Sequence, residues 1–169
     1  MGIPEENLQY ELSHSTKLDN KHRGELAELA FMRKAAALGF SVAKPWGESE
    51  RYDVVLRAGK AFWRVQVKSV RSKSPSRKHY RVTTTNWLKL PYTADEIDFL
   101  VAYIFPEDTW YVLPVSAVET RKALFISPKC KRSKLEKYRE AWKLLQPVCV
   151  DPAPPGSPPQ GDRRDLPAT

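Results

Sequence analysis

Apolar and polar residues alternate from Ala61 to Val70, and this period of two predicts a half-buried β-strand. Its two faces separate cleanly, with Trp63, Val65 and Val67 on one and Arg64, Gln66 and Lys68 on the other. Shorter β-branched runs predict strands at 40–42, 53–57, 80–85, 98–105 and 109–113. A turn at 58–60 makes the first three strands a meander, and a Pro-Glu-Asp turn makes the last two a hairpin.

Helical spacing is found near both ends of this strand-rich segment. One helix is predicted from Asp19 to Leu38, with Gly39 as its C-cap and with spacing set by Leu26, Leu29, Ala30, Arg33 and Ala37. A second is predicted from Ser133 to Gln146, with Ser133 as N-cap and Glu136 in the capping-box position. Its apolar stripe would be Leu135, Tyr138, Trp142 and Leu145. A short helix is expected at 115–119, after Pro114.

Together these elements predict an α/β domain with a mixed central β-sheet flanked by helices. We assign 1–20 to an N-terminal extension, 21–150 to the folded domain and 151–169 to a disordered tail. The tail holds 6 of the 14 prolines of the chain, so it has little apolar surface to bury.

The net charge of +8 is unevenly distributed. Residues 1–20 contribute −3 and residues 151–169 contribute −1, so the predicted domain carries +12. A basic folded body with less basic ends is typical of proteins that bind polyanions.

Several other classes of protein are disfavoured. No apolar run is long enough for a transmembrane helix, and the acidic N-terminus does not have the pattern of a secretory signal. Cys130 and Cys149 are the only cysteines, and they form neither a disulfide framework nor a metal-ligand motif. We therefore expect a cytoplasmic protein that does not bind membranes.

Candidate chemistry centres on two adjacent strands. Gln66 and Lys68 project from the same side of one strand, and Asp53 lies 13 residues before Gln66, at the start of the strand preceding it. Mg²⁺ prefers oxygen ligands, which Asp53, the amide of Gln66 and the carbonyl of Val67 would offer. Lys68 would place or deprotonate an attacking water, or hold a phosphate. Glu28, on the preceding helix, would add a second carboxylate.

In order and spacing, these residues resemble the PD-(D/E)XK nuclease superfamily, in the subset with Gln in place of one acid. Lys21 to Glu28, Gly39 to Val42, Tyr52-Asp53 and Gln66-Val67-Lys68 resemble archaeal Holliday-junction resolvases. They resemble still more the group I intron-associated homing endonucleases, which Tyr92 to Asp98 and Trp110 to Pro114 also fit. Two positions depart from the pattern: Tyr52 replaces the motif proline, and Gln66 replaces an acid.

The resemblance implies a restriction-endonuclease-like core and a metal-dependent endonuclease acting on DNA. Its catalytic residues would be Glu28, Asp53, Gln66 and Lys68. Mg²⁺, or Mn²⁺ in its place, would be held by Asp53, Gln66, the Val67 carbonyl and Glu28. The substrate would be double-stranded or branched DNA, and the protein would form a homo-oligomer, either a dimer or a tetramer.

Two basic runs without acids flank this candidate site, at 68–81 and 121–134. They supply candidate DNA-binding residues, which are Arg71, Lys73, Arg77, Lys78, Arg81, Lys129, Lys131 and Arg132. Contacts of this kind bind phosphates without reading sequence.

Two other hypotheses remain open on the sequence alone. The neutral Gln66 is also consistent with a DNA-binding module on a nuclease-like fold with little or no catalytic activity. Alternatively, Trp110 and Tyr111 would belong to an interface of a structural or partner-binding protein. The sequence does not distinguish homing, restriction, repair and junction resolution, nor DNA from RNA.

Overall fold

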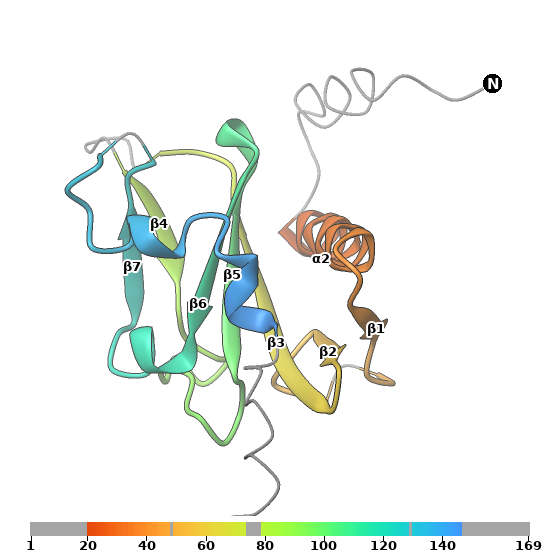
Figure 1. Cartoon of the computed structure of the whole chain (residues 1–169). Helices are drawn as coiled ribbons and strands as arrows, with labels where there is room; N and C mark the ends of the chain where they lie inside the picture. The colour runs from red at the N-terminus through yellow and green to blue at the C-terminus, as the bar shows by residue number, and fades with distance from the viewer. Residues whose placement is uncertain (1–19, 48, 74–78, 129, 147–169) are drawn as a thin grey trace, which may run out of the picture.

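The computed structural model describes residues 20–47, 49–73, 79–128 and 130–146 (Figure 1). The predicted tail at 151–169 and the extension up to residue 19 lie outside these residues. The described elements are α2 (Asn20–Ala37), β1 (Ser41–Ala43), β2 (Val54–Ala58), β3 (Ala61–Val70), β4 (Tyr80–Thr83), β5 (Phe99–Ile104), β6 (Thr109–Pro114) and β7 (Ala123–Ile126). Four short 3-10 turns complete them, at Phe105–Glu107, Val115–Ala117, Glu136–Tyr138 and Trp142–Leu145.

The centre is a mixed sheet, as the sequence predicted, and its five strands stand in the order β1-β2-β3-β5-β6. The first three strands are an antiparallel meander, and β5 and β6 form the expected hairpin. β3 and β5 are parallel, with Val65 opposite Phe99 and Val70 opposite Ile104. This alignment is reinforced at its start, where the Arg64 guanidinium lies 2.9 Å from an Asp98 carboxylate oxygen.

The two faces of the sheet are covered differently. α2 packs on one face, and a second, two-stranded sheet of β4 and β7 packs on the other (Figure 1). Because side chains alternate along a strand, Val65 and Val67 of β3 belong to the core under α2. Leu100 and Ile104 of β5 belong to the core on the opposite face.

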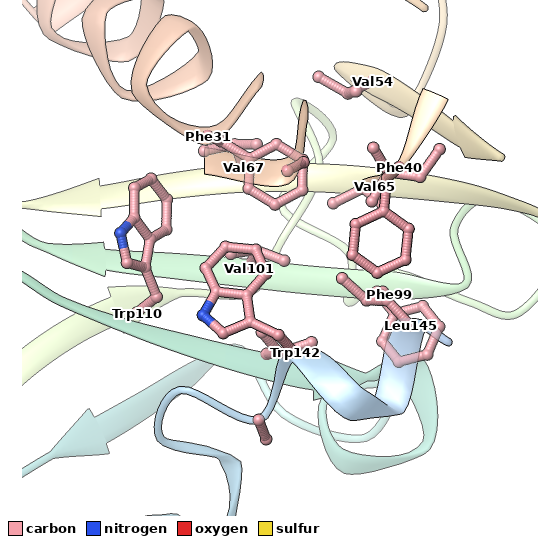
Figure 2. Close-up of a cluster of buried hydrophobic side chains, with 14 of the residues drawn as sticks. Phe31, Phe40, Val54, Val65, Val67, Phe99, Val101, Trp110, Trp142 and Leu145 are labelled. Carbon is pink, nitrogen blue, oxygen red and sulfur yellow. The ribbon is translucent and has the colours of Figure 1, made fainter. Parts of the chain in front are cut away.

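Aromatic rings fill the core under α2. The ring of Phe31 lies 5.9 Å from those of both Trp110 and Trp142, measured between centroids. Figure 2 shows these rings together, with Val67 and Val101 close by. Trp110 and Tyr111 are both buried, so the hypothesis that they form an exposed interface is wrong.

The buried stripe of α2 differs from the predicted one. Ala27, Phe31 and Ala35 are buried at intervals of four residues, whereas Leu29 is 58% exposed. The physical reason is the fit of Phe31 against the two tryptophan rings, with an alanine one turn away on either side that lets the helix lie close to the sheet. The helix ends as predicted: Gly39 has φ of 89°, and the N–H of Phe40 donates to the carbonyl of Ala35.

The predicted C-terminal helix at 133–146 is wrong. The chain forms two 3-10 turns there, separated at Glu140, which has φ of 47°. The backbone N–H of Glu140 donates to the Trp110 carbonyl at 2.8 Å, and the Glu140 carboxylate accepts from the Trp110 N–H at 2.7 Å. These bonds satisfy the outer edge of β6, which a continuous helix would leave unpaired.

β7 was not predicted from the sequence. It lies within the second basic run, and its alternating pattern buries Leu124 and Ile126 while exposing Phe125. The short helix expected at 115–119 is a 3-10 turn at Val115–Ala117. Among the described residues, no helix combines the length and the apolar character needed to span a membrane.

Two glycine-to-alanine substitutions in and after α2 should change the free energy of unfolding in opposite directions. Gly39→Ala should lower the free energy of unfolding by about 1–2 kcal/mol, because φ of 89° disfavours any side chain. Gly24→Ala should raise it by about 0.5–1 kcal/mol, because a methyl group there meets no atom within 4 Å and alanine favours the helix. Urea denaturation of both variants checks this, and a loss of stability in Gly24→Ala would contradict it.

Candidate functional site

A cleft of about 550 Å³ opens between α2, the segment after β1, the start of β2 and the middle of β3. All four predicted catalytic residues line it, namely Glu28, Asp53, Gln66 and Lys68. Val67, whose carbonyl was a candidate metal ligand, lines it as well. The topology explains this meeting: pairing of β2 with β3 sets Val54 opposite Val65, so Asp53 is held beside the middle of β3.

Backbone and side-chain donors fix the Asp53 carboxylate. The N–H of Asp53 donates to the Val65 carbonyl at 2.9 Å, which holds its backbone against β3. The N–H of Val67 then donates to Oδ2 of Asp53 at 2.8 Å, and Nε2 of Gln66 donates to the same oxygen. Within the described chain, the hydrogen bonds to this carboxylate all end on Oδ2, so Oδ1 is available for another partner.

Burial disfavours charge on both central groups. It raises the pKa of Asp53 to about 6, and nearby Glu28 adds to that rise, while the Val67 N–H and Lys68 oppose it. Burial also lowers the pKa of Lys68, against the attraction of Asp53 and Glu28. A carboxylate and an amine that are both desolvated in one cleft are typical of a site that acts on a charged ligand.

Gln66 is 6% exposed, and its amide has a defined orientation. Nε2 faces Asp53 and also donates to the Val67 carbonyl at 3.2 Å, whereas Oε1 accepts from the Tyr92 hydroxyl at 3.1 Å. In this orientation Gln66 acts as a donor that positions Asp53. Coordination of a metal by Oε1 would require the amide to turn over, after which the Tyr92 hydroxyl would accept from Nε2.

Glu28 reaches the cleft from α2 and is paired with a residue that the sequence analysis missed. The ammonium of Lys44 lies 2.7 Å from Oε2 of Glu28. The hydrogen bond to Glu28 is the main cause that raises the pKa of Lys44. Lys44 follows β1 directly, and β1 pairs with β2, which begins next to Asp53.

Tyr92 is the second residue that the sequence analysis did not assign to the site. The Tyr92 hydroxyl donates to Gln66, and the Tyr92 ring lies 5.5 Å from the Lys68 ammonium. Tyr92 therefore contacts two of the four predicted catalytic residues. Burial raises the pKa of Tyr92 above its ordinary value. Its place in the segment 92–98, which fits the nuclease pattern, was the available signal.

The donor set fits a divalent metal of the hard, oxygen-binding kind. The described residues contain no cluster of three or more His, Cys, Asp and Glu side chains. Mg²⁺ needs only one or two carboxylates and keeps several waters. Asp53 and Glu28 would supply the carboxylates, with the Val67 carbonyl as a further oxygen.

None of the predicted DNA-binding residues that the structure describes lines the cleft. Arg81 is exposed on β4, Lys131 and Arg132 are exposed after β7, and Lys73 lies 3.6 Å from Glu107. Arg71 is half-buried after the end of β3, and Arg77, Lys78 and Lys129 lie outside the described residues. The basic side chains at the cleft, besides Lys68, are Lys21, Arg23 and Lys44.

Comparison with known proteins gives consistent matches. A family model described as PD-(D/E)XK endonuclease matches residues 18–145. The structure of a bacterial homing endonuclease, I-Ssp6803I, is 29% identical in sequence, with a TM-score of 0.67, and the match covers 76% of this chain and 93% of that one.

A second solved structure is more distant. A Holliday junction resolvase, Hjc from Archaeoglobus fulgidus, is 19% identical with a TM-score of 0.42, over 62% of this chain and 84% of that one. A search of curated proteins found no match.

The buried carboxylate predicts a distinctive pH dependence. Because the pKa of Asp53 is raised from 3.8 to about 6 in the folded state, the unfolded chain releases this proton first as pH rises. The free energy of unfolding of the wild type therefore falls as pH rises from about 4 to about 6. Asp53→Asn has no carboxyl group at this position and should not show this fall. In EDTA, the stability of Asp53→Asn relative to the wild type should rise by about 2 kcal/mol between pH 4 and pH 7. Urea denaturation across this range checks the prediction, and a difference independent of pH would contradict it.

Proposed function

The chain belongs to the PD-(D/E)XK endonuclease family, and from this premise we propose that it is a metal-dependent endonuclease that hydrolyses DNA phosphodiester bonds. The observation that carries the proposal is the meeting of Glu28, Asp53, Gln66 and Lys68 in one cleft, with Asp53 desolvated. The similarity to I-Ssp6803I, a homing endonuclease, supports DNA as the substrate.

Asp53 and Glu28 would hold the metal, preferably Mg²⁺ with Mn²⁺ as a substitute, and the Val67 carbonyl would complete the protein ligands. When bound, the metal neutralises charge on the scissile phosphate. Its positive charge would also favour the ionised form of Asp53, reversing the cost of burying that carboxylate. Gln66 would act first as a positioning residue, since its Nε2 fixes Asp53.

Lys68 would contact the phosphate or the attacking water. Because its pKa is lowered, a larger fraction of Lys68 than of an exposed lysine is unprotonated at a given pH and able to accept a proton. In its protonated form, the ammonium would stabilise negative charge as it develops in the transition state. Lys21, Arg23 and Lys44 at the cleft would add phosphate contacts, beside those expected from the two basic runs.

Cleavage of both DNA strands in one binding event would use two such sites, because each cleft holds a single set of these residues. We therefore expect a homo-oligomer, a dimer or a tetramer, that acts on double-stranded or branched DNA. Its assembly brings two clefts to one substrate.

The proposal predicts metal-dependent nicking of supercoiled plasmid and of branched DNA. Cleavage should occur with Mg²⁺ or Mn²⁺ and stop in EDTA. Asp53→Ala and Lys68→Ala should each lose at least about 100-fold in rate, the loss expected when a group that stabilises the transition state is removed. Lys60→Ala, an exposed lysine in the β2–β3 turn, is the matched control and should cut like the wild type. Cleavage that survives both site substitutions would contradict the assignment.

A second function is favoured by one specific observation, the orientation of Gln66. With Nε2 facing Asp53, Gln66 offers no oxygen to a metal in this orientation, so metal affinity would be low, as in a catalytically weak DNA-binding module on the same fold. Salt-sensitive DNA binding without cleavage in Mg²⁺ or Mn²⁺ would favour this alternative. Loss of cutting with retained binding in Lys68→Ala would exclude it.

A further inference from the structure

The chain between β4 and β5 exposes three apolar side chains close together. In residues 84–91, which we name the Asn86 loop, Trp87 is 75% exposed, Leu88 49% and Leu90 54%. An apolar side chain stabilises the fold only through the surface that it buries. The exposed surface of these three side chains is therefore unfavourable in water. Adjacent exposed apolar side chains mark a binding surface more often than scattered ones do.

Internal hydrogen bonds keep this loop from collapsing onto the protein. Oδ1 of Asn86 accepts from the backbone N–H groups of Leu88 at 3.0 Å and Leu90 at 3.2 Å. The backbone N–H of Asn86 donates to the Leu90 carbonyl at 2.9 Å, and Thr85 and Pro91 form a bridge at the base. Trp87 is therefore presented outward by an ordered loop, which reduces the entropy lost when it binds a partner.

Side-chain contacts hold the loop beside the cleft. Glu96 accepts from Nδ2 of Asn86 at 3.0 Å and lies 3.5 Å from the guanidinium of Arg51. That guanidinium lies 5.1 Å from the centroid of the Trp87 ring. Arg51 in turn stands between Glu50 and Tyr52, both of which line the cleft. Trp87 is thus linked by direct contacts to the residues next to Asp53.

The C-terminal end of the Asn86 loop also leads to the cleft. Tyr92, one residue beyond Pro91, donates its hydroxyl to Gln66 and lies under the Lys68 ammonium. The C-terminal end of the Asn86 loop is therefore attached to Gln66 and Lys68, and Asn86 and Trp87 are attached to Glu96 and Arg51. A partner that touches Trp87 would also be close to the cleft.

The charges around the loop indicate which partner fits. Arg51 places a guanidinium next to the exposed ring, and Lys89 lies in the same loop, in a chain with a net charge of +8. An aromatic ring combined with cationic side chains matches a nucleic acid, whose bases offer flat apolar faces beside anionic phosphates. We propose that the Asn86 loop is a nucleobase contact in which Trp87 stacks on a base of the bound DNA near the scissile phosphate. This inference rests on the proposed function and adds to it a preference for DNA with an unstacked base.

Stacking and phosphate contacts respond differently to salt, and this difference supplies the test. Full-length protein carrying Asp53→Ala, in EDTA, would be titrated against a labelled paired duplex and the same duplex with a bulge, at several NaCl concentrations. Trp87→Ala should weaken binding by about 5- to 100-fold, with the slope of log affinity against log salt unchanged. Arg81→Ala should instead make that slope shallower by about one unit if it contacts a phosphate.

Two further variants separate stacking from loss of fold or of bulk. Trp87→Phe keeps an aromatic face and should recover most of the affinity. Phe62→Ala removes an aromatic side chain that is 63% exposed at the far end of the β2–β3 hairpin, and it should bind like the parent protein. The parent should prefer the bulged duplex, and Trp87→Ala should lose most of that preference.

Other outcomes would overturn the inference in distinguishable ways. Unchanged affinity in Trp87→Ala, with salt-dependent binding intact, would refute the base contact and leave the proposed nuclease function standing. Absence of salt-dependent binding in the parent protein would refute both. If Trp87→Ala had a different mass from the parent protein in analytical ultracentrifugation but the same affinity for DNA per protomer, the loop would be an interface between copies of this chain.

Discussion

Asp53 keeps a partly desolvated carboxylate in place because the Val67 N–H and the Gln66 amide both donate to its Oδ2. The arrangement of the site follows from this constraint. The antiparallel pairing of β2 with β3 supplies both donors, and the parallel pairing of β3 with β5 places β3 inside the sheet, where water is scarce. Burial then makes the charge on Asp53 costly, and a cation is the partner that offsets this cost.

The core and the cleft both use β3. Val65 and Val67 pack under α2 with Phe31, and Val67 also lines the cleft, whose facing wall is formed by α2. Gln66 reaches Tyr92, which belongs to the core on the opposite face of the sheet. Apolar and aromatic side chains fill both cores, whereas the cleft contains ionisable groups with raised or lowered pKa values.

The sequence predicted features that depend on neighbouring residues, and it failed where contacts between distant residues decide the structure. The alternation over Ala61–Val70 and the C-cap at Gly39 depend on neighbouring residues, and both are confirmed. The helix predicted at 133–146 failed because Glu140 forms hydrogen bonds with Trp110, 30 residues away, which no local pattern reveals. Lys44 and Tyr92 were missed for the same reason: each reaches the site only through tertiary packing. The four candidate site residues could be predicted because their order along the chain resembles that of a known family.

The most direct test of this account is the location of a bound metal. Crystals soaked in Mn²⁺ would be measured for anomalous scattering, which identifies the ion without reference to activity. The account predicts a peak about 2.1 Å from a carboxylate oxygen of Asp53, absent in crystals of Asp53→Ala. A peak elsewhere, or no peak in the cleft at saturating Mn²⁺, would contradict the proposal that this cleft holds the metal of a nuclease.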